Sequence, residues 1–355
     1  MIKLLIVDDS ALMRRQLTTL FQDQVDFVIR QARNGKEAVQ ENRDFQPDVV
    51  TLDINMPEMD GITALSLIMA ERPVPVVMVS SLTEKGALAT FEALNLGAVD
   101  YIAKPGGTIS LSIRDISDEL VVKVRTAAGA RIKGRSPIKG LAQRLREERE
   151  KPLPRPVAVR RGVAGEGLVV IGVSTGGPRT LEEILPLLPV DYPWPVLVAQ
   201  HMPAAFTKSF AERLNALCRL SVVEVASPLA IETGTIYIAK GGADMLVVQR
   251  AGKMTAIPKP ETREFLWHPS VELLGRSTLE HYDPARVVAV MLTGMGYDGA
   301  DAFTEIRKRG GRTIAESEET AVVFGMPAEL IERGGASVVL PLDKIALQLN
   351  AWAGC

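Results

Sequence analysis

Short apolar runs alternate with longer amphipathic stretches over the first third of the chain. The runs have the length and composition of strands, and the stretches between them repeat apolar residues every three or four positions, as helices do. The predicted strands are residues 2–7, 27–29, 49–52, 74–79 and 99–102, and the predicted helices are residues 12–21, 36–42, 62–70 and 87–96. Strands that alternate with helices predict an α/β fold with a doubly wound parallel sheet.

The same alternation resumes at residue 167 and predicts a second α/β domain with its own doubly wound parallel sheet. Its predicted strands are residues 168–173, 195–199, 287–292, 312–315 and 337–340. Two further strands, residues 236–239 and 246–249, are separated by residues 240–244, which we predict to form a hairpin or a tight loop.

A basic stretch separates the two regions. Residues 131–161 hold eleven Lys and Arg against three Glu, a net charge of +8, and three prolines at 152, 154 and 156 disfavour helix. We interpret the stretch as an exposed linker with a short helix at residues 141–150. It serves as a solvated tether or, as the alternative, docks a partner or an anionic surface. The predicted division is residues 1–125, a linker at 126–165, and residues 166–355.

The composition argues against a nucleic-acid partner and against a membrane span. The 355 residues are 46% hydrophobic and 24% charged with a net charge of −2, so no nucleic-acid partner is expected. No apolar run reaches the roughly 18 residues of a membrane span, and only Cys218 and Cys355 are present. We expect a cytoplasmic monomer that does not insert into membranes.

Five polar residues follow or end successive strands of the first domain. Asp8 and Asp9 follow the first predicted strand, Asp53 ends the third, and Ser80 and Lys104 leave the fourth and fifth. Parallel strands end at one edge, so these side chains should meet there. A single acid at a strand end is more often a turn or cap residue, so the prediction depends on the set. Three carboxylates suit Mg²⁺, and the cation, the ammonium and the hydroxyl together could hold a phosphoryl group.

This region resembles the response-regulator receiver family, whose fold is flavodoxin-like. The matching pieces are residues 7–10 (Val-Asp-Asp-Ser), 53–57 (Asp-Ile-Asn-Met-Pro), 79–81 (Val-Ser-Ser) and 101–105 (Tyr-Ile-Ala-Lys-Pro). The resemblance implies that Asp53 accepts a phosphoryl group from a sensor histidine kinase, and that Asp8, Asp9, Asp53 and the backbone of Asn55 bind Mg²⁺.

The resemblance also implies three switch residues in the receiver. Ser80 would be the switch hydroxyl, with Ser81 as its possible substitute. Tyr101 would be the switch aromatic residue, and Lys104 would pair with the phosphate.

A second constellation begins at Ser174. Residues 172–178 (Gly-Val-Ser-Thr-Gly-Gly-Pro) close a predicted strand and open a helix, with Pro178 in the first turn. Ser174 then lies near backbone N–H groups and the positive end of the helix dipole, which favour anionic intermediates. The stretch fits the short nucleophile pattern G-x-S-x-G. A phosphate- or nucleotide-binding glycine loop is the alternative.

The partners of a nucleophilic serine follow two other strands. His201 follows residues 195–199, and Asp298 follows residues 287–292, so one edge of the sheet can hold a base and an orienting acid beside Ser174. Glycines flank Met295, whose backbone N–H is a candidate oxyanion donor. The chain order serine, histidine, aspartate differs from that of the α/β-hydrolases, which argues against a lipase-like esterase.

Residues 167–350 resemble the catalytic domain of the chemotaxis protein-glutamate methylesterases, the CheB family. The matching pieces are residues 171–178, 200–203 (Gln-His-Met-Pro), 291–296 (Met-Leu-Thr-Gly-Met-Gly) and 318–327. The resemblance implies a Rossmann-like hydrolase without a cofactor of its own. It would remove methyl groups from glutamate methyl esters of methyl-accepting chemotaxis receptors, release methanol, and deamidate particular receptor glutamines. Three residues depart from the family's pattern: Lys240 replaces proline, Asp244 replaces a frequent histidine, and His268 replaces arginine.

The leading hypothesis is therefore a phosphorylation-activated esterase. The proposed catalytic set includes no residue of the first domain, so we expect phosphorylation of Asp53 to relieve an inhibition. One alternative is a regulatory binding protein with an inactive hydrolase-like domain. Another is a DNA-binding response regulator, which would need a basic recognition helix in a folded output domain, whereas here the basic residues lie in the linker.

Overall fold

The computed structural model describes residues 1–81, 84–104, 109–130 and 167–354; of residues 80–81, 84–85 and 109–115 it describes the backbone only. The chain divides into two compact units, Met1–Pro152 and Leu153–Cys355. Most of the predicted linker, including the helix expected at residues 141–150, lies outside the described residues. Within the described ranges, no helix is both long and apolar enough to cross a membrane.

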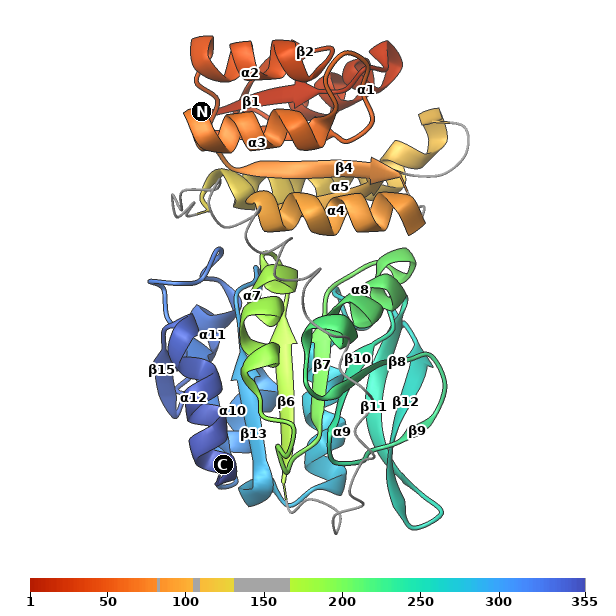
Figure 1. Ribbon diagram of the computed structural model, residues 1–355, viewed down its shortest axis with the longest axis vertical. Helices are drawn as coiled ribbons and strands as arrows, with labels where there is room; N and C mark the ends of the chain where they lie inside the picture. The colour runs from red at the N-terminus through yellow and green to blue at the C-terminus, as the bar shows by residue number, and fades with distance from the viewer. Residues whose placement is uncertain (82–83, 105–108, 131–166, 355) are drawn as a thin grey trace. The chain divides into compact units, whose positions relative to one another are not determined.

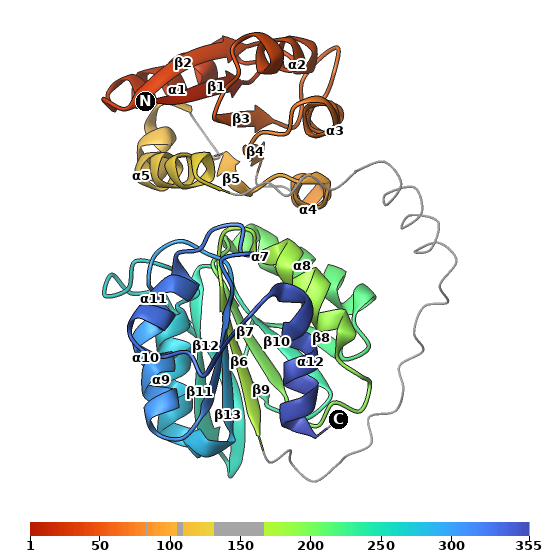
Figure 2. The ribbon, with the colours of Figure 1, turned by 90° about the vertical axis from the view of Figure 1, so that its left-hand side faces the viewer.

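The first unit is built on five parallel strands in the order β2-β1-β3-β4-β5. The strands are β1 (Ile2–Val7), β2 (Phe27–Ala32), β3 (Val49–Asp53), β4 (Val76–Ser81) and β5 (Asp100–Lys104). The helices are α1 (Ala11–Gln22), α2 (Gly35–Asp44), α3 (Gly61–Glu71), α4 (Glu84–Leu96) and α5 (Ile109–Ala128). Helices α1 and α5 cover one face of the sheet, and α2, α3 and α4 cover the other (Figures 1 and 2).

Strand β3 is buried along its whole length because helices cover both faces of the sheet. Short polar residues start the helices. The side chains of Ser10, Asn34 and Asp60 accept N–H hydrogen bonds at the first turns of α1, α2 and α3. Helix α5 runs three residues beyond the receiver boundary predicted at residue 125.

The second unit contains a seven-stranded parallel sheet in the order β15-β14-β13-β6-β7-β10-β8. Its strands are β6 (Leu168–Val173), β7 (Val196–Gln200), β8 (Ser221–Val225), β10 (Thr235–Ala239), β13 (Val287–Met291), β14 (Arg312–Glu316) and β15 (Val338–Leu340). The helices are α7 (Gly177–Ile184), α8 (Ala204–Leu217), α9 (Val271–His281), α10 (Ala300–Lys308), α11 (Met326–Glu332) and α12 (Leu342–Ala353), with short 3-10 turns at Leu185–Leu187 and Pro284–Arg286. Helices α7, α8 and α12 cover one face, and α9, α10 and α11 the other (Figure 2).

A small antiparallel sheet in the order β11-β12-β9 decides between the two predictions for residues 240–244. It consists of β9 (Leu229–Ala230), β11 (Ala243–Arg250) and β12 (Lys253–Pro260). The predicted strands around residues 240–244 do not pair as a hairpin, because β10 lies in the parallel sheet and β11 pairs with β12. The tight loop is present, and the hairpin turn lies instead at Ala251 and Gly252, which both have positive φ, as a two-residue hairpin turn requires.

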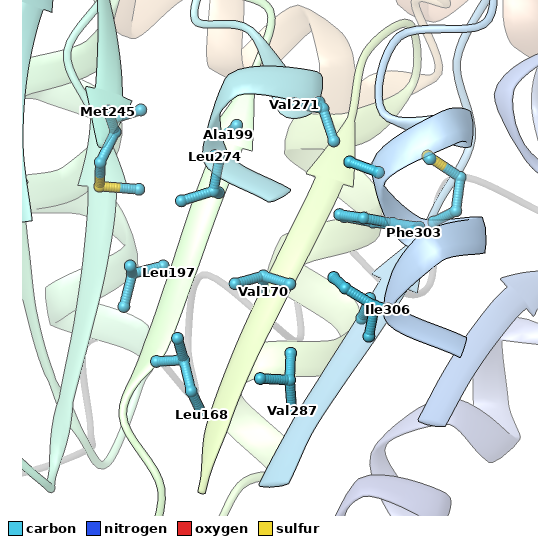
Figure 3. Close-up of a cluster of buried hydrophobic side chains, with 14 of the residues drawn as sticks. Leu168, Val170, Leu197, Ala199, Met245, Val271, Leu274, Val287, Phe303 and Ile306 are labelled. Atoms are coloured by element: carbon cyan, nitrogen blue, oxygen red, sulfur yellow. The ribbon is translucent and has the colours of Figure 1, made fainter. Parts of the chain in front are cut away.

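The main core of the second unit lies between the parallel sheet and α9, α10 and β11. Figure 3 shows Val170 of β6 and Leu197 of β7 facing Leu274 of α9, Phe303 of α10 and Met245 of β11. All five side chains are 0–1% exposed. Burying residues of this size stabilises the fold by roughly 1.5–3 kcal/mol each, which makes the sheet a rigid base for the loops at its carboxyl edge.

Candidate functional site

The predicted acidic site of the first unit is assembled at the carboxyl ends of β1, β3 and β5. Nζ of Lys104 lies 2.9 Å from Oδ2 of Asp8 and 2.8 Å from Oδ2 of Asp53. Ligand oxygens of Asp8, Asp9 and Asp53 lie within 4.8 Å of one another. Strand β1 lies between β2 and β3, where the strand order changes direction, and this is the place where α/β sheets bind ligands.

The electrostatics of this site depend on Lys104. Burial raises the pKa of Asp53 and the neighbouring Asp8 adds to the effect, while Lys104 offsets only part of it. Burial by itself would lower the pKa of Lys104, but the two carboxylates raise it on balance, so the ammonium stays charged. Clustered carboxylates, two of them buried, fit the hard oxygen ligands that Mg²⁺ prefers.

Among the other predicted receiver residues, Tyr101 is buried and Asn55 is exposed. Ser80 belongs to β4, where it pairs with Ala103 of β5, but its side chain lies outside the described part of the chain. Tyr101 is 3% exposed, and Nζ of Lys123 lies 5.3 Å from its ring centroid. The side chain of Asn55 is exposed.

Ser174 lies at the carboxyl end of β6, between the neighbouring strands β7 and β13. Its loop is bound on both sides: the N–H of Ser174 donates to the carbonyl of Thr293 at 3.0 Å, and Nε2 of Gln200 donates to the carbonyl of Ser174 at 3.0 Å. Gly176, with φ +80°, turns the chain into α7. The serine is 7% exposed, and the two hydrogen bonds hold its backbone in place.

His201 and Asp298 meet beside this loop, as predicted from their positions after β7 and β13. Nε2 of His201 lies 2.8 Å from Oδ2 of Asp298, and the two side chains are 9% and 4% exposed. Nδ1 of His201 is buried and has no hydrogen-bond partner among the described residues. With Nε2 protonated and bound to Asp298, Nδ1 carries the lone pair that a serine hydroxyl needs.

Asp298 is held by the N-terminus of α9 as well as by His201. Its carboxylate accepts backbone N–H bonds from Val271 at 2.7 Å and Glu272 at 2.9 Å, and the Ser270 hydroxyl lies 3.1 Å from Oδ1. Burial raises the pKa of Asp298, but the bond to His201 and the two N–H bonds outweigh it, so the pKa is lowered. Asp298 therefore remains ionised and orients the imidazole.

The loop that carries Met295 packs directly against Ser174. A Cβ on Gly294 would lie 2.7 Å from the Cβ of Ser174, so only glycine fits there. The hydroxyl of Thr293 donates to the carbonyl of Thr175 at 2.9 Å, and the N–H of Thr293 donates to the fully buried Glu316 at 2.9 Å. The structure thus places the loop of the predicted oxyanion donor beside Ser174.

Several residues of this site were not predicted. Gln200, Thr293 and Glu316 hold the loops, while Ser270 and the start of α9 hold Asp298. Serine before an apolar helical pattern signals a helix N-cap, so the role of Ser270 at α9 could have been found. No sequence signal indicates that a carboxylate 28 residues later binds the same helix end.

Two family models match the chain: CheB methylesterase over residues 169–349 and response regulator receiver domain over residues 4–113. The chain is 54% identical to protein-glutamate methylesterase/protein-glutamine glutaminase 3 of Rhodospirillum rubrum, over 99% of this chain and 96% of that protein. It is 52% identical to protein-glutamate methylesterase/protein-glutamine glutaminase 2 of Rhodopseudomonas palustris, over 99% and 98%. The crystal structure of the Thermotoga maritima CheB methylesterase catalytic domain matches 54% of this chain and 100% of its own, with 40% identity and a TM-score of 0.51. The chain therefore belongs to the CheB methylesterase family and carries a response-regulator receiver domain ahead of the catalytic one.

Proposed function

We propose that this chain is a cytoplasmic, phosphorylation-activated hydrolase that removes methyl esters from glutamates of methyl-accepting chemotaxis receptors and deamidates receptor glutamines. The observation that carries the proposal is the His201–Asp298 hydrogen bond beside Ser174, in a chain about half identical to protein-glutamate methylesterases/protein-glutamine glutaminases over its length.

The proposed reaction uses Ser174, His201 and Asp298 in two steps. Oγ of Ser174 attacks the ester carbonyl carbon while Nδ1 of His201 accepts the hydroxyl proton. The tetrahedral intermediate collapses, and methanol leaves with the proton that His201 returns. Water then attacks the acyl-enzyme, again through His201, and releases the glutamate carboxyl group and Ser174. A glutamine substrate follows the same course and releases ammonia.

Two groups would stabilise the negative charge of the tetrahedral intermediate. The backbone N–H of Met295 is the proposed oxyanion donor, supported by the packing of its loop on Ser174. The N-terminus of α7, which begins three residues after Ser174, adds the positive end of its dipole.

The receiver would control this activity through Asp53. We propose that a sensor histidine kinase donates a phosphoryl group to Asp53, with Mg²⁺ held by Asp8, Asp9, Asp53 and the backbone of Asn55. The cation would neutralise charge between the phosphoryl group and the carboxylates. Lys104 would pair with the phosphoryl group, and Ser80 and Tyr101 would respond to it. All the proposed catalytic residues belong to the second unit, so phosphorylation would relieve an inhibition.

The central test of the catalytic assignment is Ser174→Ala. Methanol release from methylated receptor should fall by roughly 10³-fold or more, with His201→Ala about as damaging, while phosphorylation of Asp53 is unchanged. Ser221→Ala, at the exposed start of β8, is the matched control and should behave as wild type. Turnover near the wild-type rate in the Ser174 variant would exclude it as the nucleophile.

Inhibition by the receiver is tested by truncation. A protein that begins near Gly165 should release methanol faster than the unphosphorylated full-length chain, measured on the same methylated receptor. A truncated form no faster than the full chain would mean that the receiver activates in another way.

A further inference from the structure

The segment that leads from β12 into α9 is bound to β11 by one buried carboxylate. Oδ1 of Asp244 accepts hydrogen bonds from Nδ1 of His268 at 2.8 Å and from the N–H of Ser270 at 2.7 Å. The Asp244 side chain is 0% exposed, so water does not compete for these bonds. Asp244 and His268 are two of the three positions expected from the resemblance to depart from the family's pattern, and the structure joins them in one contact.

His268 also closes the loop that precedes it. Its Nε2 lies 3.2 Å from the carbonyl oxygens of Thr262 and Phe265. Both ring nitrogens therefore face acceptors, an arrangement that a doubly protonated ring satisfies. Burial by itself lowers the pKa of His268, but Asp244, Glu261 and the Phe265 carbonyl raise it on balance.

Trp267, the residue before His268, packs against two catalytic loops. Its ring lies parallel to the ring of His201, at 7° with centroids 6.1 Å apart, and meets Tyr297 edge-on at 5.0 Å. A Cβ on Gly296 would lie 2.6 Å from the indole, so this ring also rests on the backbone beside Met295. One side chain thus contacts the proposed base and the proposed oxyanion loop.

The other end of the segment holds Asp298, the carboxylate proposed to orient His201. The Ser270 hydroxyl and the N–H groups of Val271 and Glu272 contact Asp298, as described above. Trp267 therefore packs against His201, and residues 270–272 bind Asp298. The Asp244 carboxylate binds the same segment at His268 and Ser270.

We propose that Asp244 and His268 form a positioning pair for the catalytic triad. Their hydrogen bond, together with the bond from the Ser270 N–H to Asp244, fixes residues 267–272, so that Trp267 holds the ring of His201 and the start of α9 holds Asp298. Among the described residues, neither member of the pair hydrogen-bonds to a triad side chain, and both act through the segment. The proposal rests on the proposed function, since it assigns these residues a role in the same reaction.

The first test measures the environment of Trp267 in the absence of substrate. The fluorescence of Trp267 is obtained by subtracting the spectrum of the matching Trp267→Phe protein. In Asp244→Ala and His268→Ala, the Trp267 emission should shift to longer wavelength, because the indole loses its packing on His201 and Gly296. His281→Ala, at the opposite end of α9, is the matched control and should leave the emission unchanged.

The second test measures kcat and KM of the full-length protein with methylated receptor. Asp244→Ala and His268→Ala should lower kcat by up to about 100-fold, because a misplaced base loses the reactive geometry, with KM within about twofold of wild type. Asp244→Asn keeps an acceptor for Ser270 and should lose less. Trp267→Ala should lose as much as His268→Ala, and Trp267→Phe should recover most of it.

The outcomes separate this proposal from the proposed function. An unshifted emission together with kcat within threefold of wild type would overturn the positioning role, and so would a change confined to KM. If Asp244→Ala does not fold, His268→Ala decides, because its ring is partly exposed. Wild-type protein that releases no methanol would contradict the proposed function, while the emission test would still decide whether the pair holds Trp267.

Discussion

Asp53 and Asp298 are buried to nearly the same degree, with side chains 5% and 4% exposed, yet their pKa values move in opposite directions. Asp53 accepts one backbone N–H bond, from Ile54, and pairs with Lys104, but it faces the carboxylate of Asp8. Asp298 has two backbone N–H donors, a hydroxyl and His201 around its oxygens.

The difference shows that burial alone does not determine the state of a carboxylate. Hydrogen bonds to the charged form outweigh desolvation at Asp298, while at Asp53 desolvation and a like charge outweigh one ammonium. The lowered pKa of Asp298 and the acidic surroundings of Asp53 suit the roles proposed for them. A carboxylate that orients a base has to stay ionised, and a carboxylate that accepts a phosphoryl group benefits from a nearby site for a cation.

The largest expected contrast between the two carboxylates is in catalysis. Asp298→Asn should lower methanol release by between roughly 10² and 10⁴-fold, because the amide no longer stabilises the imidazolium. Asp53→Asn should leave the unphosphorylated rate within about twofold and abolish phosphorylation. Both variants are measured on the same methylated receptor, and equal losses of basal activity would remove the distinction between them.

A smaller effect is expected from removing the ammonium in the first unit. Lys104→Gln leaves Asp8 and Asp53 facing each other and should cost about 1–3 kcal/mol of unfolding free energy at pH 7, since Lys104 is partly exposed. Added Mg²⁺ should restore part of the loss. Denaturant unfolding with and without Mg²⁺ measures both, and Arg15→Gln, at an exposed position of α1, is the control for the loss of a cation. An unchanged stability would mean that Lys104 does not compensate these carboxylates.

The smallest effect concerns stability against pH. The lowered pKa of Asp298 stabilises the second unit above the unfolded pKa, and this contribution is lost as pH falls through the folded pKa. Asp53 has a raised pKa, so it destabilises the first unit at neutral pH, and this penalty fades as pH falls through its folded pKa. At pH 7, Asp298→Asn should lower the free energy of unfolding by about 1 kcal/mol. Asp53→Asn should leave the free energy of unfolding unchanged or raise it.

Melting curves of both variants between pH 7 and pH 3 follow these contributions. The difference between each variant and wild type should shrink toward the acid end of the range. A destabilised Asp53→Asn protein at pH 7 would contradict the pKa direction assigned to Asp53.

Much of this protein could be predicted from its sequence, because the relevant signals are local. Apolar runs and turn residues place the strands, and the carboxyl ends of parallel strands share an edge. Asp8, Asp53 and Lys104 therefore meet as predicted, and His201 meets Asp298. The receiver and CheB resemblances were confirmed by the family models and by relatives that span nearly the whole chain.

Only the tertiary structure decided what surrounds these residues. Of the two predictions for residues 240–244, the tight loop is present and the hairpin is not, because β10 pairs in the parallel sheet, whose partners are distant in the sequence. Asp244 and His268 were two separate observations in the sequence, and the fold joins them in one hydrogen bond. Periodicity reports which face of an element is buried, but contacts between loops depend on how complete elements pack, so the support of Asp298 by α9 and of His201 by Trp267 could not be read from local pattern.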